Sequence, residues 1–259
     1  MCAILTRPAA ALVAAVLLPA SLHAQVISSS DRLTNRLARE LSPDVRFASS
    51  AVLHNEVSIG VDFTHLHQGG QDWALPFEWD YVPDSTWLLV LSTGVESDEP
   101  RGGPRGSGID DPVLSATYRF AALGPLKLAL TAGYEFPAHG DVGSTSGAEK
   151  LSLAGVYQLA PGLTASLTAA ASRVDAAAAG SSQFAERGKV GIAWDLSGGS
   201  DVSVALQRSH AGAAGGQTAA QAIFDLPLKA PFSLSFALSR VLTGSAKDTD
   251  GEVDLVVDF

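Results

Sequence analysis

Ser209 and His210 are the only adjacent serine and histidine after residue 24. A serine nucleophile activated by a histidine base is a common pair for acyl transfer. The two residues end an alternating segment, 201–209, and neighbouring side chains on a strand point to opposite faces. Adjacency therefore does not bring the hydroxyl to the imidazole, and we interpret His210 as a loop histidine. No catalytic residue is predicted.

Two further spacings could hold a metal ion. His65 and His67 would share one strand face, but no third histidine or carboxylate stands at a matching spacing. Residues 248–252, Asp-Thr-Asp-Gly-Glu, are similar to a calcium loop without the aspartate at its fifth position, which indicates a solvated turn. The glycines at 102–108 follow no strand-then-helix phosphate pattern. We expect no metal and no cofactor.

The composition excludes several classes of protein. The chain has 27 Asp and Glu against 17 Lys and Arg, a net charge of −10, whereas nucleic-acid binding requires the opposite sign. Its one cysteine, Cys2, lies in a segment expected to be removed, so disulfides and thiolate metal sites are not expected. No later segment is long and apolar enough for a membrane-spanning helix.

The amino terminus has the order of a secretory signal peptide over residues 1–24. Arg7 precedes an apolar run, 9–19, and the small residue Ala24 suits cleavage. A buried amino-terminal helix is the alternative interpretation. A signal peptide implies export, and here we expect the outer membrane.

Residues 25–56 form a separate amino-terminal segment in this interpretation. Leucines at 33, 37 and 41 recur at helical spacing and predict a short amphipathic helix over 30–41, with arginines on another face. Ser42-Pro43 ends that pattern. The helix could insert its arginines into the barrel predicted below as a plug. The alternative is that the segment lies at the periplasmic rim or stays partly disordered.

From about residue 57 onward, apolar residues alternate with small or polar ones. In 126–136 the even-numbered residues are mainly apolar and the odd-numbered ones small or polar, which gives a strand with one apolar and one wet face. The same pattern predicts strands at 57–67, 73–82, 86–96, 110–120, 126–136, 149–159, 163–173, 185–196, 201–209, 218–226, 232–241 and 251–259. A soluble β-sandwich would show the same alternation.

Three observations favour an all-β fold, a transmembrane antiparallel barrel of about twelve strands over 57–259. Most of the strands have the roughly 9–11 residues that cross a bilayer at a tilt. After the first strands, short turns alternate with longer loops, as in bacterial barrels with short periplasmic turns. The longer loops are expected at 97–109, 137–148, 174–184, 209–217 and 242–250.

The third observation is the last predicted strand. Val253, Leu255 and Val257 alternate ahead of a terminal aromatic residue, Phe259. This row resembles the carboxy-terminal assembly signal of outer-membrane barrels. The resemblance implies recognition by the barrel-assembly machinery.

With the apolar face outward, charged side chains face the lumen. The predicted lumen residues are Asp62, Glu78, Asp80, Arg119, Lys127, Glu135, Lys189, Asp195, Asp225 and Asp254. They lean acidic, which predicts a preference for cations or neutral solutes over anions. The alternative is that opposite charges pair across the lumen and only keep it wet.

Residues 108–112 and 118–120, followed by Tyr134-Glu135-Phe136-Pro137, resemble a segment of the outer-membrane family assigned to the meta-pathway of phenol degradation. In that family a glycine-rich loop leads into a strand that ends in an aromatic residue. Here Gly108-Ile109-Asp110 departs from Gly-x-Gly-Asp, and Ala138-His139 stands in place of the family's threonine. The resemblance implies passage of aromatic or hydrophobic compounds and carries over no catalytic residue.

We therefore predict a non-enzymatic outer-membrane channel or transporter for a small-molecule solute. A structural or surface-interaction barrel with a closed lumen is the second interpretation, and an outer-membrane lipid hydrolase is the third. The expected partners are outer-membrane lipid, lipopolysaccharide and the barrel-assembly machinery. Arg101 and Arg105 are candidates for contact with lipopolysaccharide phosphates.

Overall fold

The structure is a computed structural model that describes residues 55–66, 70–99, 106–138, 146–175, 182–196, 200–211, 216–229, 232–243 and 249–258. The predicted signal peptide, the predicted helix over 30–41 and Phe259 lie outside these residues. The strands are β1 (Glu56–Leu66), β2 (Gly70–Tyr81), β3 (Trp87–Glu99), β4 (Gly106–Ile109), β5 (Val113–Arg119), β6 (Leu126–Glu135), β7 (Ala148–Ala160), β8 (Leu163–Asp175), β9 (Ser182–Asp195), β10 (Asp201–Ala211), β11 (Gly216–Pro227), β12 (Phe232–Thr243) and β13 (Thr249–Asp258). Within the described ranges, no helix is long and apolar enough to cross a membrane.

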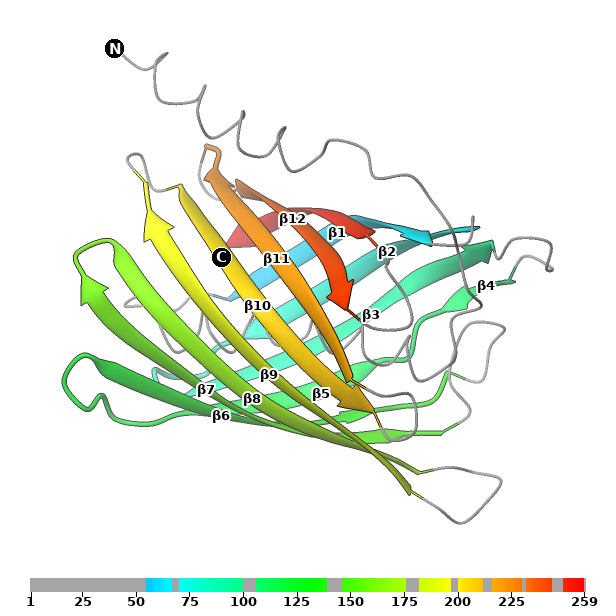
Figure 1. The fold of residues 1–259 in the computed structure, drawn as a ribbon, viewed down its shortest axis with the longest axis horizontal. Helices are drawn as coiled ribbons and strands as arrows, with labels where there is room; N and C mark the ends of the chain where they lie inside the picture. The colour runs from blue at the N-terminus through cyan, green and yellow to red at the C-terminus, as the bar shows by residue number, and fades with distance from the viewer. Residues whose placement is uncertain are drawn as a thin grey trace.

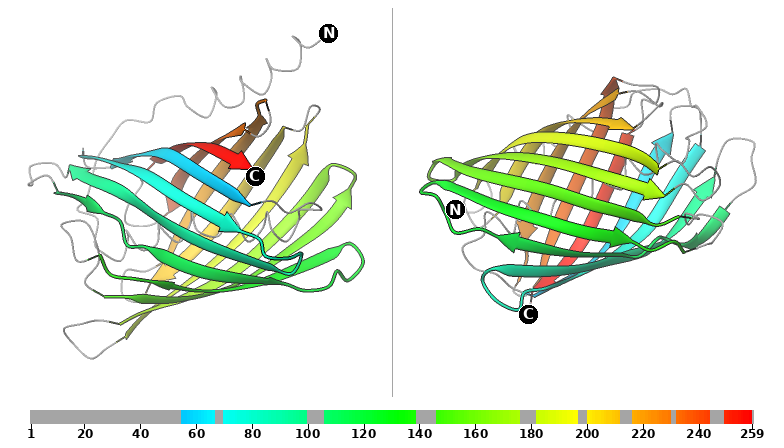
Figure 2. Two further views of the ribbon diagram at one scale, coloured as in Figure 1. Left: turned by 180° about the vertical axis from the view of Figure 1, so that it is seen from behind. Right: turned by 90° about the horizontal axis from the view of Figure 1, so that it is seen from below.

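The strands close into an antiparallel barrel. Neighbours in the chain pair with each other, and β1 pairs with β13 to complete the ring. Because β4 and β5 both pair with β3, they form one interrupted strand, and the ring has twelve members. The tilted strands enclose an interior, with β7–β9 on one side and β1–β3 on the other (Figures 1 and 2). The predicted fold is confirmed.

The interruption between β4 and β5 is a β-bulge. Ser92 of β3 stands opposite Val113, whereas Val95 stands opposite Ile109, so the β4–β5 chain has one residue more than its partner over this stretch. An extra residue reverses which face the following side chains take. The bulge thereby keeps both Ile109 and Leu114, at 60% and 51% exposed, on the outer face.

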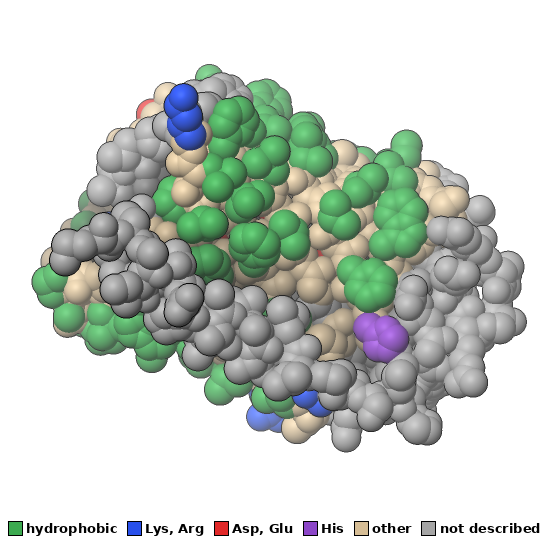
Figure 3. All heavy atoms as spheres, turned by 90° about the horizontal axis from the view of Figure 1, so that it is seen from above, with side chains coloured by type: hydrophobic (Ala, Val, Ile, Leu, Met, Phe, Trp, Pro, Cys, Tyr) green, Lys and Arg blue, Asp and Glu red, His purple; other side chains and the backbone are tan. Residues whose placement is uncertain are grey.

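The outer face is apolar. On β1 the exposed fractions are 57% for Ile59, 55% for Val61 and 45% for Phe63, whereas the intervening Asp62 is 1% exposed. Hydrophobic side chains gather on the face in Figure 3, with few charged side chains among them. This pattern inverts that of a soluble domain, in which large apolar patches are rarely exposed.

Aromatic side chains pack in pairs near both ends of this apolar face. Trp87 packs edge-on against Tyr118, with ring centroids 5.1 Å apart, and Tyr118 packs in the same way against Phe120. These rings lie beside 82–86 and 120–125, which belong to the end we call the turn end. The opposite end, where β1, β3 and β6 finish, we call the loop end. A ring of aromatic residues at a strand end is typical of the girdles of membrane barrels.

Several strands reach further toward the loop end than predicted. β3 continues to Glu99, and β4 lies within the expected loop 97–109. β9 begins at Ser182, within the expected loop 174–184. The apolar alternation ends at the edge of the apolar face, but the backbone ladder continues beyond it, so the sequence pattern marked the apolar face and not the whole strand.

Gly94 provides a test of close packing in the barrel wall. A Cβ added at Gly94 would stand 2.9 Å from the Leu75 carbonyl oxygen and 3.2 Å from Pro76 Cα, both of them backbone atoms. We expect Gly94→Ala to lower the free energy of unfolding by about 1–3 kcal/mol, because β2 and β3 must separate. Gly251→Ala is the control, since its added Cβ has nothing within 4 Å. Urea unfolding in lipid vesicles measures both, and equal stabilities would contradict the prediction.

Candidate functional site

The inner face of each strand lies opposite its exposed apolar side chains. All ten of the charged residues named from the sequence are on this face: Asp62, Glu78, Asp80, Arg119, Lys127, Glu135, Lys189, Asp195, Asp225 and Asp254. Asp62 and Glu135 are each 1% exposed, whereas Asp195 is exposed at the turn end. Arg119 Nη2 donates to the Ser85 carbonyl oxygen at 2.6 Å, so this arginine is bound to the turn between β2 and β3.

Carboxylates dominate one wall of the barrel interior. The neighbouring strands β13, β1, β2 and β3 contain no Lys or Arg. Their inner faces carry what we call the acidic wall: Glu56, Asp62, Asp72, Glu78, Asp80, Glu96, Glu252 and Asp254. Like charges directly opposite each other destabilise a strand pair, and here Asp62 faces Glu252 and Glu56 faces Asp80. All of these carboxylates have polar or electrostatic interactions in the structure.

Cations lie on the opposite side of the ring. The inner-face residues Lys127 on β6, Lys150 on β7, and Arg187 and Lys189 on β9 form what we call the basic wall. In a ring of twelve members, β1 and β2 stand across from β8 and β9. Glu78 and Lys150 line the same small cavity of about 40 Å³, so the two walls approach each other there. The interior therefore carries a field directed across it.

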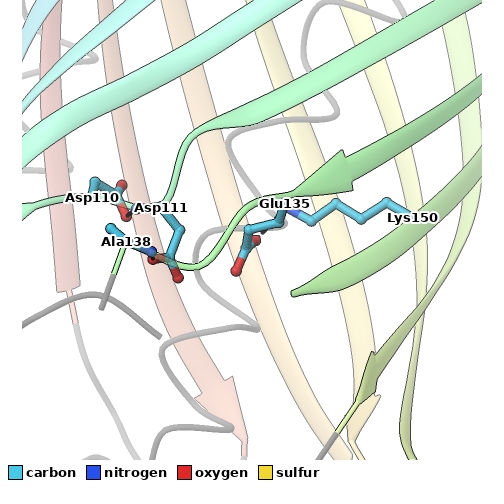
Figure 4. A network of polar contacts seen from close by, with 5 residues as sticks. All are labelled: Asp110, Asp111, Glu135, Ala138 and Lys150. Carbon is cyan, nitrogen blue, oxygen red and sulfur yellow. Dashed lines mark hydrogen bonds and ion pairs between the residues drawn. The ribbon is translucent and has the colours of Figure 1, made fainter. Parts of the chain in front are cut away.

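A buried ion pair and the bulge stabilise the strands next to the small cavity where the two walls come near each other. Lys150 Nζ lies 2.8 Å from Glu135 Oε2, with side chains 11% and 1% exposed. At the bulge, Asp111 Oδ1 accepts a hydrogen bond from the Ala138 N–H at 2.8 Å, which joins the β4–β5 corner to the end of β6. Figure 4 shows both contacts, with Glu135 next to Asp111. Asp111 is 3% exposed and was not named from the sequence, although it lies two residues before the buried Val113 in the strand predicted at 110–120.

A cavity of about 450 Å³ lies in the inner wall between β6 and β11, near the turn end. We call it the turn-end recess. Ser166, Gly191 and Ala205 stand side by side in its floor on β8, β9 and β10. Charged and amide side chains border that floor: Lys127, Lys189, Gln221, Asp195, Asp201 and Asp225. Lys189 Nζ donates to Gln221 Oε1 at 2.6 Å.

The residues considered for chemistry are not brought together. Ser209 is 5% exposed on the inner face, whereas His210 is exposed on the outer face. His65 is half-buried on the outer side of β1, and His67 lies outside the described residues. Among the described residues, no group of three or more His, Cys, Asp or Glu could hold a metal ion.

Some inner-face residues were predictable but were not named from the sequence. Lys150 alternates with Leu151 and Leu153, and Arg187 alternates with Gly188 and Val190, so the period of two was sufficient to find both. The turn-end recess had no such signal, because it depends on which residues of β6–β11 stand side by side.

The assembly-signal row lies on the outer face of β13. Val253 and Leu255 are 43% and 40% exposed, and Val257 is half-buried. Phe259 lies outside the described residues.

No family model matches the chain, and no curated protein matches its sequence. Solved structures do match the fold of the chain. An outer-membrane channel from Pseudomonas putida F1 matches with a TM-score of 0.64 at 13% identity, over 82% of this chain and 98% of that one. The NanC porin matches with a TM-score of 0.61 at 5% identity, over 78% and 99%. The translocator domain of the autotransporter NalP from Neisseria meningitidis matches with a TM-score of 0.56 at 13% identity, over 89% and 98%.

These likenesses, together with the closed ring and its apolar exterior, define the class. The chain has the porin-like fold of outer-membrane β-barrels. Since channels and a translocator domain share this architecture, the fold alone does not assign the activity.

The Glu135–Lys150 pair gives a prediction about stability. Glu135→Ala leaves a lysine that is 11% exposed without its carboxylate, and we expect a loss of about 3–5 kcal/mol in the free energy of unfolding. The control is Glu149→Ala, which removes a partner of Arg173 at 3.9 Å in an exposed pair and should cost about 0–1 kcal/mol. Urea unfolding followed by tryptophan fluorescence compares them, and similar losses in both variants would rule out this role for the buried pair.

Proposed function

We propose that this protein is a channel of the outer membrane that passes small polar solutes. The observation that carries the proposal is the inner face of the ring, whose acidic and basic walls oppose each other. A barrel of about twelve strands is wider than one filled by its own side chains, so water or solute space is expected. The porin-like fold supports a channel more than it supports the other interpretations.

The inner charges favour polar solutes over hydrophobic ones. Transfer of an apolar compound past the acidic wall would strip water from carboxylates, which is costly. The resemblance to the phenol-degradation family is not confirmed by a family match, and passage of aromatic compounds stays a weaker prediction. Because the inner charges lean acidic, we propose a modest preference for cations.

Two alternatives stay open to experiment. In a closed barrel, the charges would pair across the lumen and serve stability alone. A lipid hydrolase would need a serine and a histidine near each other, and Ser209 and His210 lie on opposite faces of β10. We therefore propose that the protein is not an enzyme.

The outer face of the barrel supports our proposals on membrane location, assembly and lipopolysaccharide contact. We propose that the apolar exterior sits in outer-membrane lipid after export and that the row Val253, Leu255 and Val257 contributes to recognition by the barrel-assembly machinery. We also propose contact with lipopolysaccharide at the loop end. Arg101 and Arg105, the first candidates for that contact, lie outside the described residues.

A furrow on the outer face supports the lipopolysaccharide contact. Ala169 of β8 and Gly188 of β9 stand between Leu153 of β7 and Arg208 of β10 in one row of the sheet. A cavity of about 610 Å³ results, and a Cβ at Gly188 would meet nothing within 4 Å. We propose that the furrow holds an acyl chain whose phosphorylated headgroup reaches Arg208 at the loop end.

Removal of one cation tests the furrow. Arg208→Gln should lower the lipopolysaccharide that stays bound after detergent extraction by at least about twofold, because a charge-assisted phosphate contact is lost. Arg240→Gln, an exposed change on β12 away from the furrow, is the control. Bound phosphorus per barrel is the measurement, and equal retention by both variants would argue against a specific contact.

Single-channel conductance tests the channel. The refolded protein in a planar bilayer should show stepwise openings, and the reversal potential under a salt gradient should indicate cation preference. The double variant Glu78→Gln, Asp254→Asn should weaken that preference, whereas Glu149→Gln, which is exposed on the outer face, should not. A correctly inserted but silent barrel would favour the closed-lumen alternative. Anion preference would exclude the proposed selectivity.

A further inference from the structure

The turn-end recess exists because three neighbouring strands contribute small side chains at the same level. Ser166, Gly191 and Ala205 form one row of its floor. A Cβ on Gly191 would stand 2.9 Å from Ser166 Oγ and 3.3 Å from Ala205 Cβ. The row on the turn side of it, Thr164, Ala193 and Ser203, is also small. A volume of about 450 Å³ falls within the usual range for small-molecule sites.

Longer side chains, three of them polar, border the two sides of this floor. Lys127 of β6 and Gln221 of β11 lie at opposite ends of the first row, and Gln158 of β7 and Ile223 of β11 lie at the ends of the second. The recess is therefore a shallow basin with hydrogen-bonding groups on both sides.

Charges of opposite sign mark the two other edges. Lys189 belongs to the row on the loop side of the floor, and its Nζ reaches back to Gln221 Oε1 at 2.6 Å. On the turn side, Asp195, Asp201 and Asp225 stand opposite one another on β9, β10 and β11. Asp201 and Asp225, like Lys127, already have polar interactions, so a solute would exchange contacts with ordered groups.

The spacing between these edges selects the length of a ligand. Gln221 and Asp225 are four residues apart on β11. Gln221 marks the cationic edge, because Lys189 Nζ donates to its side chain. At about 3.3 Å per residue, their Cα atoms are roughly 13 Å apart, and the side chains shorten the gap between charges. A free α-amino acid has its two charges too close together to reach both edges. An extended tripeptide, at roughly 10 Å, has about the right length.

We propose that the turn-end recess binds short zwitterions with separated charges, in particular unblocked peptides of about three residues. The carboxylate lies at Lys189 and Gln221, with Lys127 as the second cation of the basin. The ammonium lies at the aspartate row, and the peptide amides bond to the serine, threonine and glutamine side chains between. This proposal rests on the proposed channel, since it names the solute class for a site in the channel wall.

Triglycine is the probe, and two blocked forms supply the chemical controls. Calorimetric titration of the refolded barrel in detergent measures binding without any need for conduction. Acetylation of the triglycine amine and amidation of its carboxylate should each weaken binding by about tenfold, because each removes one charged contact. Equal binding of all three forms would overturn the proposal.

Variants then assign each end of the peptide. Lys189→Met should weaken triglycine binding by about tenfold and abolish the advantage of triglycine over its amide, while the effect of acetylation persists. Asp225→Asn should do the reverse. Lys229→Met, an exposed change outside the recess, should leave binding unaltered. If the variants refold but lose both preferences together, the assigned orientation is wrong.

Single-channel conductance distinguishes a failure of the peptide-binding proposal from a failure of the channel proposal. Block of single-channel current by triglycine, weaker in Lys189→Met, would support both. Stepwise openings with no calorimetric binding would overturn the recess and leave the channel. Calorimetric binding by a silent barrel would support the recess as a site and overturn the channel.

Discussion

The need to pair every backbone N–H and C=O group in apolar surroundings governs this structure. Lipid offers no hydrogen bonds, so a sheet with an apolar exterior must have no free edge. The β1–β13 ladder meets that need, with ten register pairs from Glu56–Asp258 to His65–Thr249. Closure fixes the register of the ring, and the register fixes which face each side chain takes. The bulge before β5 meets the same need, because the Asp110 N–H there still donates to the Gly94 carbonyl oxygen at 2.9 Å.

With the faces fixed, side-chain size decides where space exists. On the inner face, small residues on β8–β10 open the turn-end recess. On the outer face, Ala169, Ala171 and Gly188 open the furrow between leucines and Arg208. Both features lie on β8, β9 and β10, the recess toward the turn end and the furrow toward the loop end, and their side chains alternate along the same strands.

The period of two predicted the twelve members of the ring, because burial on one face imposes that period. It missed β4, whose Gly-Ser-Gly-Ile sequence has only one apolar residue to mark a face, so β4 lies within an expected loop. The recess could not be predicted, since Ser166, Gly191 and Ala205 are distant in sequence and meet only through register. The sequence also gave no sign that its inner charges would separate into two walls.

The separation of the inner charges into an acidic and a basic wall bears both on the stability of the barrel and on the proposed transport. Carboxylates spread evenly around a lumen would repel one another. Here the acidic wall on β13, β1, β2 and β3 lies across the interior from the basic wall on β6–β9, so the two walls attract each other and their charged groups remain hydrated. The low-dielectric wall strengthens this field. A solute with one charge gains from one wall and is repelled by the other. A solute with separated charges of both signs can contact a cation and a carboxylate at once, as the proposed peptide does in the turn-end recess. In the proposed channel, the interactions that stabilise the lumen are therefore also those that select its solutes.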